Sequence, residues 1–72
     1  MTKITERIVQ IVAAGGGVIL NAEEKVTDQL VQIASIAAES GATVILRNAD
    51  TKVTEQLVQI ATAGKGRVIF EL

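Results

Sequence analysis

The chain has 72 residues, a formal net charge of −1 and a hydrophobic content of 49%. This length allows one domain, and a chain this short hides only roughly 60% of the surface that its unfolded form exposes. The apolar content exceeds what so small a monomer can hide, so the composition predicts self-association. Balanced charge without a basic stripe, and a single aromatic residue, Phe70, argue against nucleic-acid binding.

The chain contains no Cys, which excludes disulfides and thiolate metal sites, and no His, the usual residue of general acid–base catalysis. Trp, Tyr and Pro are missing too, although proline alone averages about 5% of residues. These omissions are typical of a designed or simplified sequence. The irregular loops are unlike an idealised design, so a natural origin stays open beside a designed one.

One phrase occurs three times and predicts the order of the elements. Its copies are TERIVQIV from Thr5, TDQLVQIA from Thr27 and TEQLVQIA from Thr54, and each is followed by glycine and an apolar triplet. The apolar spacing within the phrase is helical, and β-branched triplets bounded by turn residues are typical of strands. The sequence therefore predicts one α/β repeat domain with the order α-β-α-β-α-β, in units at about 4–21, 26–48 and 53–72.

The first helix is expected over residues 5–14. The run from Ile8 to Leu20 is almost wholly apolar, which raises the question of a targeting or membrane segment. It is too short to span a bilayer, Gly15 to Gly17 interrupt it, and similar stretches recur deeper in the chain. We therefore expect it to be a helix and a strand, with no membrane partner.

The second and third helices are expected over residues 27–40 and 54–63. A threonine precedes each run as a predicted N-cap, and a glycine follows it as a predicted left-handed stop. Ile36 lies about 120° from the centre of its helix's apolar arc, so it is either an ordinary exposed isoleucine or a contact with another chain. The predicted caps are Thr5, Thr27 and Thr54, and the predicted stops are Gly15, Gly41 and Gly64.

The strands are expected at Val18–Leu20, Val44–Leu46 and Val68–Phe70, paired in parallel through the helices. Side chains alternate along a strand, so the central isoleucines should line the face away from the helices. Parallel sheets are almost always covered on both faces. Either all helices lie on one side and another chain covers the isoleucines, or the strand order is shuffled and one helix covers the far side. The likeness of the units favours the first arrangement.

The strand Val44-Ile45-Leu46-Arg47-Asn48, followed by a loop and a helix, resembles a unit of the leucine-rich-repeat family, with Asn21 and Asn48 near that family's asparagine position. The resemblance implies stacked units in a horseshoe that binds proteins on its strand face. The third unit has Glu71 in place of asparagine, and the threonines at 5, 27 and 54 are separated by 22 and 27 residues. The likeness therefore concerns architecture, and a minimal piece of a doubly wound α/β fold is the competing likeness.

Two glycine-rich segments, Gly15 to Gly17 and Gly64 to Arg67, invite comparison with a phosphate loop. A phosphate loop leads from a strand into a helix N-terminus, whereas these segments lead from a helix into a strand. A ligand site of an open α/β sheet instead lies beyond the carboxyl ends of the strands. The loops there carry carboxylate and amide oxygens, which are suitable ligands for a hard cation. Asn and Asp are also common in turns, so turn formation accounts for these residues as well. These candidate ligand-facing residues are Asn21, Glu23, Glu24, Asn48 and Asp50.

The sequence predicts a self-associating structural domain without catalytic residues, cofactor or metal, and it favours a homodimer. The segment from Arg67 to Leu72 is apolar and expected at a sheet edge, where it could join a second copy. Two alternatives remain open: a repeat-type module that binds other proteins through the sheet face or the loops, and a small-ligand or metal-binding domain at those loops. The candidate interface residues are Ile19, Ile45, Ile69, Ile36, Phe70 and Leu72.

Overall fold

The computed structural model describes the backbone of residues 2–72 and the side chains of residues 6–72. Helices and strands alternate along this part of the chain, as predicted, and a short 3-10 helix follows each of the first two strands. The elements are α1 (Thr2–Ala13), β1 (Val18–Asn21), η1 (Ala22–Glu24), α2 (Thr27–Ser40), β2 (Val44–Arg47), η2 (Ala49–Thr51), α3 (Thr54–Gly64) and β3 (Val68–Phe70).

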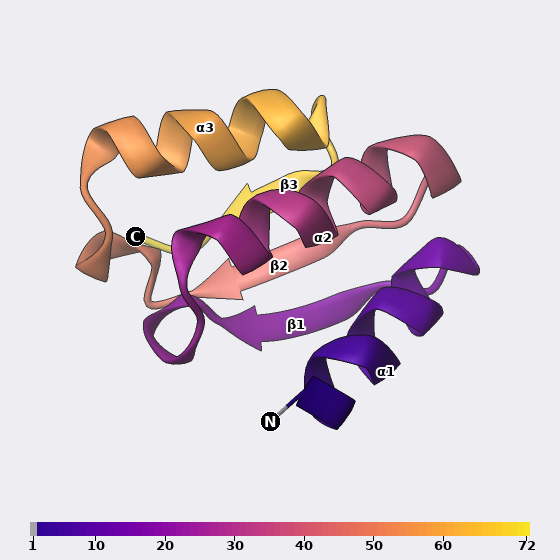
Figure 1. Ribbon diagram of the computed structural model, residues 1–72. Helices are drawn as coiled ribbons and strands as arrows, with labels where there is room; N and C mark the ends of the chain where they lie inside the picture. Colours follow the sequence, from indigo (N-terminus) through magenta and orange to yellow (C-terminus); the bar gives the residue numbers. More distant parts are fainter. Residues whose placement is uncertain (1) are drawn as a thin grey trace.

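The strands form one parallel sheet in the order β1-β2-β3 (Figure 1). Ile19 pairs with Ile45, and Ile45 with Ile69, so equivalent residues of successive units stand side by side. This order confirms the prediction of stacked α-β units. It also excludes the shuffled strand order that would have allowed a helix to cover the second face.

The helices form a single layer over one face of the sheet, with α2 between α1 and α3 (Figure 1). Side chains of the strands alternate accordingly: Leu20, Val44 and Leu46 are buried beneath the helices. On the opposite face Ile19 is 64% exposed and Ile69 is 50% exposed. The predicted alternation is therefore confirmed, and no helix of the described chain covers the isoleucines.

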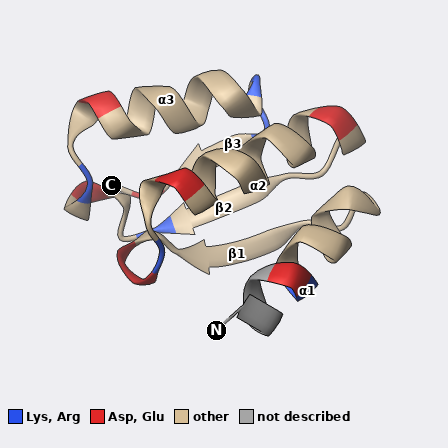
Figure 2. Ribbon diagram, in the orientation of Figure 1, with Lys and Arg blue, Asp and Glu red and all other residues tan. Residues whose placement is uncertain are grey.

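The core lies between the helix layer and the sheet and is entirely apolar. Among the described side chains, no polar or charged one is buried. Charged residues instead lie in the loops, near the ends of α2, α3 and β2, and in α1 (Figure 2). The largest fully buried side chains are Leu30, Ile33, Leu46, Ile60, Val12 and Val44.

The predicted threonine caps are wrong. α2 has Val26 as its N-cap, whose carbonyl accepts hydrogen bonds from the amides of Gln29 and Leu30. Val53 caps α3 in the same way, and neither valine makes a side-chain cap. Thr27 and Thr54 are thus the first helical residues, one position beyond the cap that a hydroxyl would need. α1 begins at Thr2, which places Thr5 inside the helix, and the Thr5 side chain lies outside the described residues.

Two of the three predicted helix stops are confirmed. Gly15 has φ 94° and Gly41 has φ 83°, the left-handed conformation that glycine adopts without strain. The amides of Gly15 and Gly16 bond to the carbonyls of Val12 and Ile11, which forms a Schellman motif.

The third stop is shifted by one residue. Lys65, with φ 49°, occupies the left-handed position, and its amide bonds to the carbonyl of Ala61. Gly64 belongs to α3 and is buried. A Cβ on Gly64 would stand 2.5 Å from Cγ2 of Val68 and 3.5 Å from Cβ of Ala34. Close packing of α3 on Val68 of β3, rather than backbone conformation, therefore requires glycine at this position.

We expect Gly64→Ala to lower the free energy of unfolding by about 1–3 kcal/mol, because the added methyl overpacks a tight contact. Urea denaturation measures the change. In a Val68→Ala background the opposing Cγ2 is gone, so the same substitution should cost less. An equal loss of unfolding free energy in both backgrounds would show that a contact with Cγ2 of Val68 is not the cause.

We expect Lys65→Gly to raise the free energy of unfolding by about 0.5–1 kcal/mol, because glycine takes the left-handed conformation without a Cβ penalty. Thermal and urea unfolding both report this change. The matched control is Lys65→Ala, which removes the ammonium group but keeps Cβ. If alanine stabilised as much as glycine, the backbone strain at residue 65 would not be the cause.

Candidate functional site

The bare sheet face carries an apolar row across all three strands. Ile19, Ile45 and Ile69, here named the isoleucine row, are register partners on β1, β2 and β3. The outer two are half or more exposed, and Ile45 between them is partly exposed. Neighbouring strands lie about 4.8 Å apart, so the three side chains form one continuous strip.

A polar row follows the isoleucine row at the carboxyl ends of the strands. Asn21 and Arg47 are register partners there, and Nε of Arg47 lies 3.4 Å from Oε1 of Glu71. Both side chains of this ion pair are more than half exposed, so water screens it and it adds little stability. The isoleucine row therefore borders on charge and amide groups rather than on further apolar surface.

The strand-end loops bring the two predicted asparagines together. Nδ2 of Asn48 donates to Oδ1 of Asn21 at 3.1 Å, and the same oxygen accepts from the amide of Glu23 at 3.0 Å. Asn48 has φ 58°, a conformation that asparagine tolerates better than most residues. The two asparagines thus join equivalent turns of successive units.

A second bond connects the same loops. Nζ of Lys52 donates to the backbone carbonyl of Lys25 at 2.8 Å, and this bond is partly buried. Lys52 and Lys25 both end a 3-10 turn, η2 and η1 respectively. The lysine of one unit therefore satisfies a backbone group of the preceding unit.

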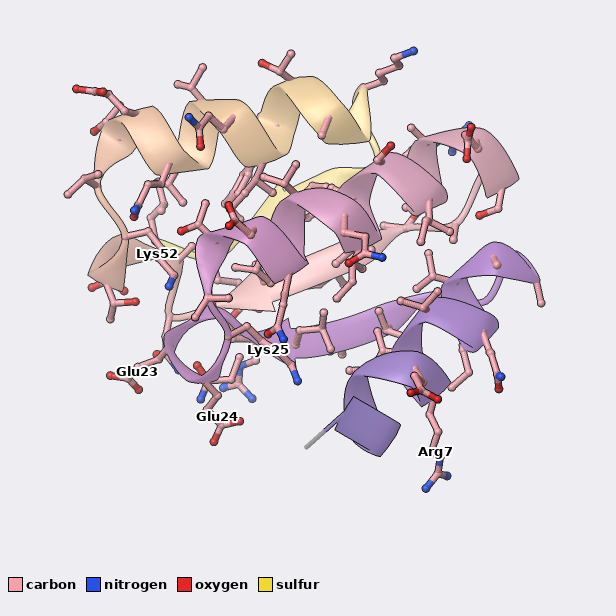
Figure 3. All side chains as sticks on the ribbon, in the orientation of Figure 1. Arg7, Glu23, Glu24, Lys25 and Lys52 are labelled. Atoms are coloured by element: carbon pink, nitrogen blue, oxygen red, sulfur yellow. The ribbon has the colours of Figure 1, made fainter. Side chains whose placement is uncertain are left out.

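The predicted acidic residues of these loops do not converge. Glu23, Glu24 and Asp50 are all exposed, and Figure 3 shows Glu23 and Glu24 pointing outward from η1. In the described part of the chain, no three Asp, Glu, His or Cys side chains come close enough to hold a metal ion. Of the five candidate ligand-facing residues, the structure brings together only Asn21 and Asn48.

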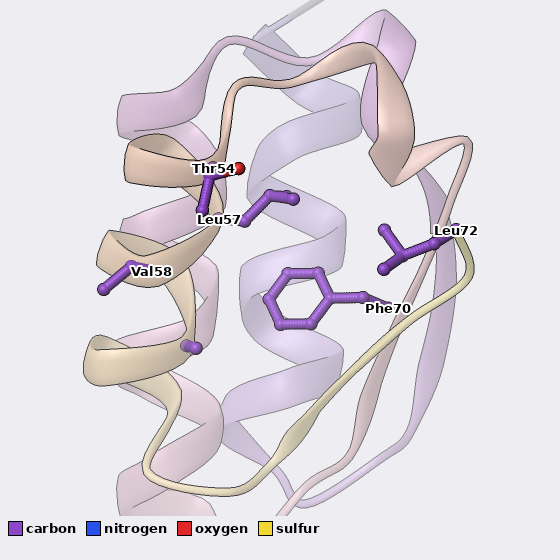
Figure 4. Close-up of a pocket in the computed structure, with 6 residues that line it drawn as sticks. Thr54, Leu57, Val58, Phe70 and Leu72 are labelled. Carbon is purple, nitrogen blue, oxygen red and sulfur yellow. The ribbon is translucent and has the colours of Figure 1, made fainter.

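The third feature is an apolar groove between α3 and β3, with a volume of about 220 Å³. Figure 4 shows the ring of Phe70 pointing from β3 toward α3, where Leu57 and Val58 lie. Phe70 is half-buried, whereas Leu72 is 83% exposed. The residues that line the groove are Thr54, Leu57, Val58, Ala61, Phe70 and Leu72.

The sequence did not point to this groove, although a signal for it was present. Val58 and Ala61 repeat Val31 and Ala34 of the preceding copy, and Ala34 is 1% exposed. Within the described residues no further unit covers these positions of the third copy, and Val58 is 56% exposed. Apolar residues retained at the last copy of a repeat therefore predict an uncovered end.

Ile36 was expected on the exposed side of its helix, and this placement is wrong. The side chain is half-buried and packs against the core cluster. The reason is that α2 has a helix on either side as well as the sheet beneath it. Its buried arc is therefore wider than that of a helix with a single apolar face, and the alternative of a contact between Ile36 and another chain stays a prediction.

Comparison with known proteins yields no relative, since the chain matches no protein-family profile, no characterised protein and no solved structure. Among the described helices, none has the length and apolar content to cross a membrane. Function must therefore be argued from the sheet face, the loops and the groove.

We expect Asn21→Ala to lower the free energy of unfolding by about 1 kcal/mol, because the amides of Glu23 and Asn48 lose their acceptor. Asn21→Asp is the matched control, since it keeps an acceptor oxygen at the same place. It should lose less than the alanine variant in urea denaturation at neutral pH. Equal losses would mean that neither hydrogen bond to Asn21 stabilises the loops.

Proposed function

We propose that this chain is a structural α/β repeat domain that self-associates, with the isoleucine row as an associating surface and no catalytic activity of its own. The observation that carries the proposal is the uncovered row on one face of a parallel sheet, where Ile19 is 64% and Ile69 is 50% exposed. Parallel sheets are normally covered on both faces, because their strands are apolar on both sides.

The surroundings of the isoleucine row support a protein interface. The register places the polar positions Asn21 and Arg47 one step beyond the row, and Thr43 and Arg67 precede it on the same face. An apolar centre with a polar rim is the usual anatomy of a protein–protein contact. A second copy would bring an identical apolar strip, so the two strips can cover each other.

The two serines of the chain also support a structural role. The Ser40 hydroxyl donates to the carbonyl of Val12 at 2.5 Å and accepts from the amide of Ala42 at 3.3 Å. Val12 lies in the last turn of α1 and Ser40 ends α2, so this hydroxyl ties the two helices together. Ser35 is exposed on the outer side of α2.

A second candidate function is the binding of a different protein on the same sheet face. It is favoured by the likeness to leucine-rich-repeat proteins, whose strand face binds proteins, and by the bond between Asn21 and Asn48 in equivalent turns. In this case the isoleucine row would stay accessible in the pure protein at high concentration. Self-association of the row, by contrast, would remove it from solvent.

Sedimentation equilibrium across a concentration series tests the proposed function. We expect the average mass of the wild-type protein to rise above that of the monomer. Ile45→Lys places a charge in the middle of the row and should weaken association about tenfold or more, since burial of one isoleucine is worth about 1.5–3 kcal/mol.

The matched control is Gln32→Lys, which adds the same charge on the exposed side of α2. Circular dichroism confirms that both variants fold. A wild-type protein that stays monomeric at high micromolar concentration would overturn self-association. If Ile45→Lys and Gln32→Lys associate as the wild type does, the sheet face is not an interface.

A further inference from the structure

The two ends of the stack of units are unlike each other. Ile33 and Ile60 occupy the same place in the second and third copies of the repeated phrase, and they are 1% and 0% exposed. Each of these residues has a unit before it in the stack. Ile11 holds the same place in the first copy, which has no unit before it within the described residues, and it is 46% exposed. The isoleucine of the phrase is therefore buried only where a preceding unit is present.

The opposite relation holds for the residue that follows this isoleucine. Val12 and Ala34 are 0% and 1% exposed, and each has a unit after it in the stack. Ala61 holds the same place in the third copy, which the described part of the chain leaves without a following unit, and it is exposed. Val58 is likewise 56% exposed, although Val31 at the same place in the second copy is half-buried.

Contacts within the chain show how this junction is made. A Cβ on Gly64 of α3 would lie in ordinary contact with Cβ of Ala34 on α2, at 3.5 Å, and Ser40 on α2 bonds to the carbonyl of Val12 on α1. In both junctions the later helix meets the earlier one at the Val12 or Ala34 position. Ala61 of α3 is the equivalent residue in the third copy, and it lines the groove.

We propose that copies of this chain associate head to tail, with the flank of α1 and the edge of β1 of one copy seated against α3 and β3 of the next. The occupant of the groove between α3 and β3 is then the first unit of a second copy, with Ile11 buried as Ile33 and Ile60 are. This inference rests on the proposed self-association and adds a second interface to the sheet face.

The sheet supports the same arrangement. β1 and β3 are its two edges, and within the chain each strand pairs in parallel with the next. An edge strand presents unpaired amides and carbonyls that accept another strand. Parallel pairing of β3 with β1 of the next copy repeats the pairing already present between β1 and β2.

The alternative is a two-fold joint between two β3 edges, which corresponds to the dimer that the sequence favoured. That joint would set Val58 and Ala61 against their own counterparts and leave Ile11 exposed. Neither junction within the chain pairs these positions with themselves. Head-to-tail association uses different surfaces on the two partners, so it builds rings or open filaments.

The test uses one variant for each end of the stack. Both are prepared in the Ile45→Lys background, so that association through the sheet face is weakened. Ile11→Lys blocks the α1 end, and Val58→Lys blocks the α3 end. Both residues are about half exposed, so the variants should fold, and circular dichroism verifies this. Gln59→Lys, on the exposed side of α3, is the matched control.

Sedimentation equilibrium should show that Ile45→Lys still associates, and that either end variant raises the apparent dissociation constant about tenfold or more. An equimolar mixture of the two end variants should form a one-to-one heterodimer, because each supplies the end that the other lacks. The Gln59→Lys control should associate as its background does.

Other outcomes overturn the inference in distinguishable ways. If Ile45→Lys is monomeric while the wild type associates, the sheet face is the only interface and the proposed function stands alone. If Val58→Lys blocks association and Ile11→Lys does not, the joint is two-fold. If the mixture of the two end variants stays monomeric although each is folded, the ends do not recognise each other.

Discussion

Burial between successive units, rather than within any one of them, holds this structure together. α2 has a helix on each side and buries Leu30, Ile33, Ala34 and Ala37. α3 has one helical neighbour and buries only Ile60 and Gly64. The phrase that encodes these helices is nearly the same, so the difference in burial comes from the neighbours. A single unit removed from the stack would keep its apolar side chains but would have nothing to cover them.

Among the described residues, side-chain hydrogen bonds between the units are few, and they lie at the two ends of the sheet. Asn21 with Asn48 and Lys25 with Lys52 join the loops at the carboxyl ends of the strands, and Ser40 joins α2 to α1 at the other end. Each bond connects a residue of one unit to the unit beside it. The backbone hydrogen bonds between the strands set the register of the stack, and these side-chain bonds reinforce it.

The sequence was sufficient to predict the elements, the parallel pairing and the bare isoleucine face, since these follow from periodicity and alternation. The sequence did not predict the features that depend on contacts between elements. Lys65 rather than Gly64 takes the left-handed position, because Gly64 is needed for the approach of α3 to Val68. Ile36 was misplaced because α2 is covered from both sides. The groove at α3 was missed because the repeated phrase has nearly the same residues in the second copy, which another unit covers, and in the third copy, which is uncovered.

The two layers of this molecule repeat at different intervals, and this difference has a geometric consequence. Neighbouring strands lie about 4.8 Å apart, whereas neighbouring helices lie about 8–10 Å apart. A stack with its helices on one side must therefore bend, with the strands on the inside of the curve. Gly64 acts on the distance between the two layers, since a Cβ there would stand 2.5 Å from Cγ2 of Val68 on β3. The difference between the helix spacing and the strand spacing thus sets the curvature, and in a longer stack it would set the diameter of the arc.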